Sequence, residues 1–186
     1  FFTQIILMSV IVAGIFFVWQ TIQETRVLNQ IIARLEADSR IAQVLVTNVS
    51  FDEVKRLTKT TIKFVEFDTN GSPLEPKYFT FSGNIIQFQS LVVRFQDKFA
   101  RSGDKLRGRS IYLFWKAFSL KGPNTQEYEI TPLQTVPRGY RLDSKKSSGF
   151  EEKIWAEFWK YALDPQSGQR LGIKNAQIEA PGTVFV

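Results

Sequence analysis

Cysteine and histidine are both absent from the 186 residues, and this double absence removes several classes of chemistry. Without cysteine the chain can form no disulfide, no thiolate nucleophile and no Cys/His zinc site. Without histidine it can form no Ser-His-Asp triad and lacks the commonest general acid–base. Any catalysis would depend on Asp, Glu, Lys or Tyr. We therefore expect a protein that is not an enzyme and that uses no metal and no cofactor.

Pairs of carboxylates are the remaining candidates for acid–base catalysis. Asp52 and Glu53 form one pair, and Glu151 and Glu152 form another. The members of each pair are sequence neighbours, which do not face each other on a helix and do not converge across a cleft. We interpret both pairs as charges at helix starts, where acidic side chains interact favourably with the helix dipole.

Long runs of one charge are missing as well. The chain has 24 Lys and Arg against 18 Asp and Glu, which gives a net charge of +6, and these charges are spread out. The densest basic stretch reads as a glycine-containing loop with the residues Lys98, Arg101, Lys105, Arg107 and Arg109. It is a candidate patch for an anionic headgroup, an acidic glycan or an acidic partner, and alternatively a solvated loop. We expect no nucleic-acid partner.

The first 19 residues contain no charged side chain. Nineteen helical residues span roughly 28 Å, close to the hydrocarbon thickness of a bilayer. Trp19 stands where an indole favours the membrane–water interface, and no cleavage site of a signal peptide follows it. The sequence therefore predicts a transmembrane helix over residues 1–20, with the lipid bilayer as a partner. Its anchoring side chains would be Ile5, Ile6, Leu7, Val10, Ile11, Val12, Ile15, Phe16, Phe17 and Trp19.

The orientation of this helix rests on two opposing arguments. Arg26, Arg34 and Arg40 follow the apolar run closely, which favours a cytoplasmic position for the rest of the chain. A single anchor followed by a large β-rich domain is, in contrast, typical of the secretion side. We expect a single-pass protein of the bacterial inner (cytoplasmic) membrane, with its C-terminal domain extracytoplasmic in the periplasm.

A helical pattern continues beyond Trp19 to about Val46. Its apolar stripe follows alternating steps of three and four residues, is interrupted at Asp38, and consists of Leu28, Ile31, Leu35, Ala42 and Leu45. Such a stripe suits a short coiled coil or a contact with a neighbouring helix, and it equally suits a helix that packs on its own domain. We expect a helical stalk over residues 21–47 whose partner is another membrane protein or a second copy of the chain.

Residues 48–186 read as one β-rich domain. Ser50 and Glu53 have the spacing of a capping box, which predicts a short helix through about Leu57. β-branched and aromatic residues then predict strands, with a turn at Asn70-Gly71. The predicted strands are Thr60–Phe67, Lys77–Ser82, Ile85–Phe95, Ile111–Leu120, Glu127–Thr131 and Gly139–Leu142. Because no Met precedes Phe1 and residues 181–186 read as an interrupted strand, we expect further chain beyond both ends.

A second helix is predicted to begin near Ser148. Ser148 and Glu151 have capping-box spacing, and Asp164-Pro165 would end the helix. Trp155 and Trp159 lie four residues apart on its broad apolar face. They could form an exposed aromatic ledge for a sugar or a protein, or pack in the core against the sheet.

The layout of the first 47 residues is similar to that of a mature type IV pilin or pseudopilin. This similarity depends on Phe1, on the long half-apolar helix after it and on the β-rich domain that follows. Members of that family normally have an acidic residue at the fifth position and a proline near the twenty-second, where this chain has Ile5 and Ile22. The resemblance implies a filament subunit whose N-terminal helices stack in many copies.

The predicted fold class is therefore α+β, with a single N-terminal transmembrane helix, a helical stalk and an antiparallel β-rich domain with one covering helix. The predicted function is a non-catalytic, membrane-anchored subunit or scaffold of an envelope multiprotein complex, whose outer domain makes protein–protein contacts. Two alternatives stay open. One is a pilin-like or pseudopilin-like filament subunit, and the other is a ligand-binding accessory or sensor with an open pocket near Trp155 and Trp159.

Overall fold

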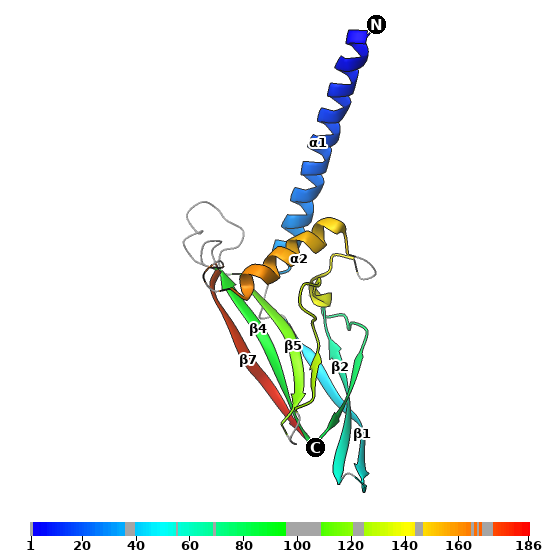
Figure 1. Cartoon of the computed structure of the whole chain (residues 1–186), viewed down its shortest axis with the longest axis vertical. Helices are drawn as coiled ribbons and strands as arrows, with labels where there is room; N and C mark the ends of the chain where they lie inside the picture. The colour runs from blue at the N-terminus through cyan, green and yellow to red at the C-terminus, as the bar shows by residue number, and fades with distance from the viewer. Residues whose placement is uncertain are drawn as a thin grey trace.

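A long N-terminal helix precedes a two-sheet domain in the computed structural model (Figure 1). Helix α1 (Phe2–Ala33) projects away from the domain, and the two chain termini lie at opposite ends of the molecule (Figure 1). Side chains of α1 are described from Val10 onward, and the described residues of the chain are 2–35, 40–54, 56–68, 70–95, 109–120, 125–143, 147–164, 166, 168 and 173–186.

The predicted transmembrane helix is not supported by this structure. Across the described residues, no helix combines the length and the apolar character that crossing a membrane requires. The finding contradicts the expected single-pass anchor, the expected bacterial inner-membrane location and the periplasmic, cell-envelope setting inferred from them.

The predicted helical stalk over residues 21–47 is also wrong. Helix α1 ends at Ala33, and strand β1 (Ala42–Asp52) begins well before the expected end of the stalk. The helical spacing of three and four residues that includes Ala42 and Leu45 overlaps with a second apolar pattern, which repeats every two residues. This second pattern places Ala42, Val44 and Val46 on one face, and valine is a residue that favours strands.

Two antiparallel sheets make up the domain. The three-stranded sheet has the order β1-β2-β3, with β2 (Leu57–Glu66) and β3 (Lys77–Ser82). The four-stranded sheet has the order β6-β5-β4-β7, with the bounds β4 (Ile85–Phe95), β5 (Ser110–Ser119), β6 (Glu127–Glu129) and β7 (Ile173–Phe185).

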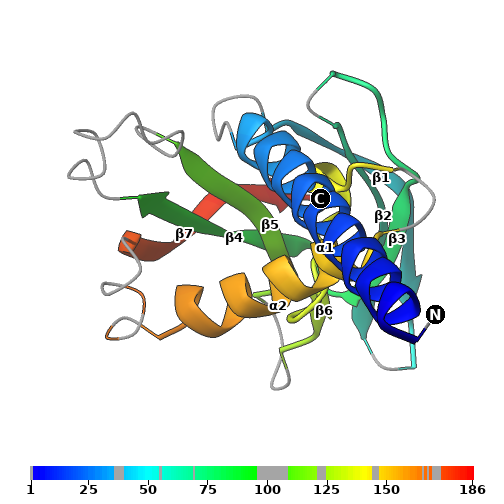
Figure 2. The ribbon, with the colours of Figure 1, turned by 90° about the horizontal axis from the view of Figure 1, so that it is seen from above.

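The four-stranded sheet is the middle layer, because its two faces bury different cores. Ile86 and Phe88 of β4 pack on the three-stranded sheet, where Phe64 lies 5.8 Å from Phe88 between ring centroids. Leu91 and Val93 of the same strand have the opposite parity and pack on the helical side. Helix α2 (Gly149–Ala162) covers the upper part of that side, next to the base of α1 (Figures 1 and 2).

Helix α2 begins as the sequence predicts. The Ser148 hydroxyl accepts a hydrogen bond from the Glu151 amide at 3.1 Å, and the Glu151 carboxylate accepts one from the Ser148 amide at 3.3 Å, which is a complete capping box. Trp155 and Trp159 are both fully buried against the sheet. The core interpretation of this pair is therefore confirmed, and an exposed aromatic ledge is not present.

Local predictions succeed for five of the seven described strands, miss β1 and most of β7, and fail at two further places. The predicted bounds of β3 and β4 agree with the structure, and Gly71 has the positive φ of 77° expected at its turn. The short helix expected from Ser50 is absent, because β1 continues through that residue as the partner of β2. The strand expected at Gly139–Leu142 is replaced by the 3-10 turn η3 (Arg138–Tyr140).

Candidate functional site

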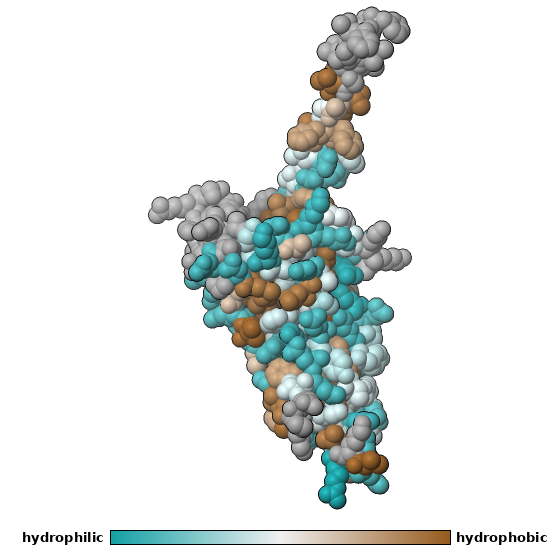
Figure 3. Space-filling view, viewed as in Figure 1, coloured by the Kyte–Doolittle hydropathy of each residue, from teal (hydrophilic) through white to brown (hydrophobic). Residues whose placement is uncertain are grey.

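The upper segment of α1, Val10–Trp19, is an apolar surface that the described residues of the domain leave uncovered. Its large side chains are between 51% and 72% exposed, and they are Val10, Ile11, Val12, Ile15, Phe16, Phe17, Val18 and Trp19. Figure 3 shows apolar atoms gathered on this projecting part of the helix. Burying one such side chain contributes about 1.5–3 kcal/mol, so their joint exposure costs on the order of 10 kcal/mol. Apolar patches of this kind mark interaction surfaces.

A polar stretch separates this segment from the domain. Gln20 donates a hydrogen bond to Glu24 at 3.2 Å, and the hydroxyls of Thr21 and Thr25 donate to carbonyl oxygens one turn earlier, at 3.0 and 2.8 Å. These polar side chains therefore have partners within the helix itself. The upper segment is distinct from the apolar residues at the helix base.

The base of α1 is anchored in the domain core. Ile31 and Leu35 are buried in the same cluster as Trp155 and the inner residues of β4 and β5. Arg34 donates hydrogen bonds to the carbonyl oxygens of Arg141 and Leu142, the latter at 3.5 Å. Packing and hydrogen bonds together fix the direction in which the helix leaves the domain.

A buried arginine, Arg40, forms a second link within the domain just before strand β1. Arg40 forms an ion pair with Glu66, donates to the Gly139 oxygen at 3.2 Å and lies 4.9 Å from the centre of the Tyr140 ring. A Cβ atom at Gly139 would overlap the guanidinium group of Arg40, so a larger residue there would force this side chain to shift. Burial raises the pKa of the Glu66 carboxyl, although Arg40 opposes this effect. This cluster is enclosed in the fold, and its contacts are structural.

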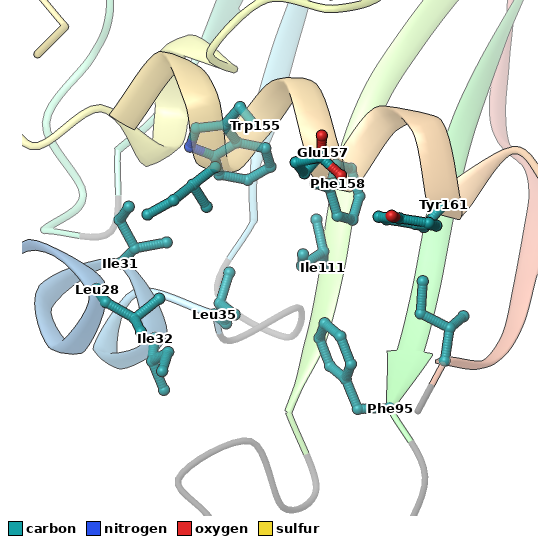
Figure 4. Close-up of a pocket in the computed structure, with 12 residues that line it drawn as sticks. Leu28, Ile31, Ile32, Leu35, Phe95, Ile111, Trp155, Glu157, Phe158 and Tyr161 are labelled. Atoms are coloured by element: carbon teal, nitrogen blue, oxygen red, sulfur yellow. The ribbon is translucent and has the colours of Figure 1, made fainter. Parts of the chain in front are cut away.

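An apolar groove of about 450 Å³ lies beside the base of α1 (Figure 4). Helix α1 contributes Leu28 and Ile32, α2 contributes Trp155 and Phe158, and the strand ends contribute further apolar side chains. Glu157 is the one acidic residue among the described residues that line it. The groove has the size of a ligand pocket, but the described residues that line it do not supply the convergent polar groups that orient a polar substrate.

The structure separates the predicted contact residues of the stalk. Leu28, Ile31 and Leu35 are at the α1 base, whereas Ala42 and Leu45 are on β1. The predicted anchor side chains from Val10 to Trp19 are on the exposed upper segment. Ile5, Ile6 and Leu7 belong to helix α1, but their side chains are not among those described.

The predicted anionic-partner patch is placed only in part. Arg109 is half-buried just before β5. Its four companions, Lys98, Arg101, Lys105 and Arg107, lie outside the described residues.

The sensor alternative named an open pocket near Trp155 and Trp159, and Trp155 does line the groove, but the strand residues that form its walls were not predicted. Its walls include Phe95, Ile111 and Ile173, which belong to three different strands and are far apart in the chain. Each of these residues reads in the sequence as an ordinary core position of a strand. The available signal was weak: the steps from Leu28 to Ile31 and Leu35 indicated a helical face that needs cover.

The chemistry of the described part is that of contact surfaces. Among the described residues, no group of three or more Asp or Glu side chains could hold a metal ion. Comparisons with protein-family models, with curated proteins and with solved structures find no match for this chain. The arguments about function therefore rest on the exposed apolar surfaces and on the way in which the domain holds them.

Proposed function

We propose that this protein is a non-catalytic subunit of a multiprotein assembly, and that the upper segment of α1 attaches it to apolar helices of other protein subunits. The single observation that supports this most strongly is the exposure of eight large apolar side chains on ten consecutive helical residues, Val10–Trp19. The backbone groups inside a helix are already paired with each other, so a partner can bind it only through side chains. Another helix suits this contact, because the side-chain ridges of one helix fit into the grooves of the other.

The anchoring of the helix base favours this role over that of a loosely attached tail. Ile31 and Leu35 bury the base, and Arg34 ties it to the carbonyl oxygens of Arg141 and Leu142. A helix held in this way presents its far end at a fixed position relative to the domain. A subunit of an assembly needs this property, because the position of its domain is then set by the helix contact.

Site-specific photo-crosslinking in cells tests the proposal with a closely matched control. A benzophenone amino acid replaces Phe17 in one variant and Phe185 of β7 in another. Both are phenylalanines with nearly equal exposure, 72% and 75%. The proposal predicts that Phe17 captures the same few proteins in repeated experiments, through residues on an apolar helix of each, while Phe185 does not capture them.

The products of the experiment separate the alternatives. A ladder made only of this chain at Phe17 would favour the filament-subunit function that the pilin-like layout implies. Absence of protein adducts at Phe17 above the level seen at Phe185 would refute the proposal. Adducts whose partner residues lie on polar surfaces or on strands would contradict the helix-to-helix contact.

A further inference from the structure

The two sheets have four edges, and three of them are closed or protected. Between β3 and β6, Tyr128 donates a hydrogen bond to the Thr80 oxygen at 2.8 Å, and Gln126 accepts one from the Ser82 amide. The edge strand β7 has an interior proline, charged side chains and two register shifts against β4. Natural proteins use these features to block further strand pairing.

Strand β1 is the remaining edge, and it lacks such protection over most of its length. From Ala42 to Phe51 it contains no charged residue and no proline. Val49 and Phe51 are 48% and 61% exposed. They lie toward the end of β1 that forms the hairpin with β2, at the tip of the molecule farthest from α1 (Figure 1).

The hydrogen bonds beside β1 show which of its backbone groups point outward. Phe67 donates from its amide to the Ile41 oxygen at 3.0 Å, and Ile41 and Phe67 are the next opposite pair in register. Because bonded and non-bonded pairs alternate along antiparallel strands, the backbone groups of Ala42, Val44 and Val46 face away from β2.

The alternation resumes beyond the bulge at Thr47. Thr58 lies opposite Phe51, and its carbonyl accepts a bond from Gly83 on the β3 side. The backbone groups of Phe51, and by alternation those of Val49, therefore also point to the free edge.

These outward residues form a nearly palindromic series. If two β1 strands pair in antiparallel fashion about Val46, this residue meets its own symmetry mate. Val44 of one copy then lies opposite Val49 of the other, and Ala42 lies opposite Phe51. The extra residue of the bulge, Thr47, lies opposite Leu45 of the other copy, so outward residues still face outward residues on both sides of it. Five bonded pairs would form, with about ten main-chain hydrogen bonds. No like charges oppose each other across the two-fold axis, as a self-complementary contact requires.

We propose that the free edge of β1 binds the β1 strand of a second copy of this chain, which joins two three-stranded sheets into one continuous sheet. The small Ala42 opposite the large Phe51 gives the exposed ring a place on the inner face. This contact is separate from the upper segment of α1, and it leaves that segment available to other partners.

Cysteine cross-linking tests both the contact and its register, because the chain has no cysteine of its own. In the proposed pairing the Cα atoms of the two Val46 residues are about 5.5 Å apart, within the range of a disulfide. Those of the two Leu45 residues are about 8 Å apart, beyond that range. With the full chain under mild oxidation, Val46→Cys should yield at least about tenfold more cross-linked dimer than Leu45→Cys.

Amide hydrogen exchange on the unmodified full chain gives an independent measurement. The outward amides of Val44, Val46 and Val49 should become slower to exchange as protein concentration rises. Equal cross-linking of the two cysteine variants, or no cross-linking of Val46→Cys, would overturn the proposal. Exchange of these amides that is independent of concentration would do the same.

Discussion

The hydroxyl of Tyr140 is a sensitive point of the fold, and its removal is the prediction that we develop first. Tyr140 is 0% exposed, and its hydroxyl accepts a hydrogen bond from the Tyr112 amide at 3.0 Å and donates one to the Tyr112 oxygen at 3.1 Å. Strand β6 pairs with β5 only at residues 116–118, so Tyr112 has no strand neighbour on that side. One side chain thus completes the edge of β5.

The expected cost of Tyr140→Phe follows from these two bonds. The substitution keeps the ring, which packs 5.4 Å from Trp155, and therefore leaves no large cavity. It removes two hydrogen bonds of about 0.5–1.5 kcal/mol each and leaves the amide and carbonyl of Tyr112 unpaired, for a total of about 2–3 kcal/mol. Burial raises the pKa of Tyr140 to about 12, so the loss should be constant across roughly pH 6 to 9.

Urea unfolding followed by tryptophan fluorescence measures this cost. With the denaturant dependence usual for a domain of this size, the midpoint should fall by about 1 M. Tyr128→Phe is the matched control, because its exposed hydroxyl makes one bond, to the Thr80 oxygen at 2.8 Å, and its loss should cost less than about 1 kcal/mol. If Tyr140→Phe were no more destabilising than Tyr128→Phe, the role assigned to the hydroxyl would be wrong.

Two further predictions concern the helix base and a partly buried lysine, Lys77. Leu35→Ala should lower the free energy of unfolding by about 2–4 kcal/mol, whereas Leu28→Ala, at a side chain 41% exposed, should cost less than about 1 kcal/mol; equal urea midpoints would contradict the docked base. Burial lowers the pKa of Lys77 from 10.5. The folded chain then binds fewer protons than the unfolded chain just below that pH, so stability rises as pH approaches it. Urea midpoints measured from about pH 8 upward should therefore rise with pH in the unmodified chain and in the control Lys63→Met. In Lys77→Met this rise should disappear.

Elements with a strong local signal were predictable from the sequence. Strands β3 and β4 were found with the correct bounds because β-branched and aromatic residues fill them between clear turns. The Ser-x-x-Glu spacing of Ser148 and Glu151 identified the start of α2, because a capping box is formed by residues close together in the chain. Such signals depend only on neighbours in the chain.

The failures arose where two local patterns compete. Ser50 and Glu53 have the spacing of a helix cap, yet β1 runs through Ser50 because its backbone pairs with β2. The residues from Ala42 to Val46 fit both a helical stripe and an alternating strand. These residues form a strand because β2 pairs with them, and their local spacing does not show that such a partner strand is present.

The sequence by itself determined that chemistry based on cysteine and histidine is excluded, that α1 carries an apolar segment, and that aromatic residues fill the core of a β-rich domain. These properties follow from composition and short-range periodicity. Only the tertiary structure decided where α1 ends, which apolar residues stay exposed and that β1 forms an open edge. Each of these depends on which segments far apart in the chain meet, and on the buried contacts of Arg40 and Tyr140 that hold them together.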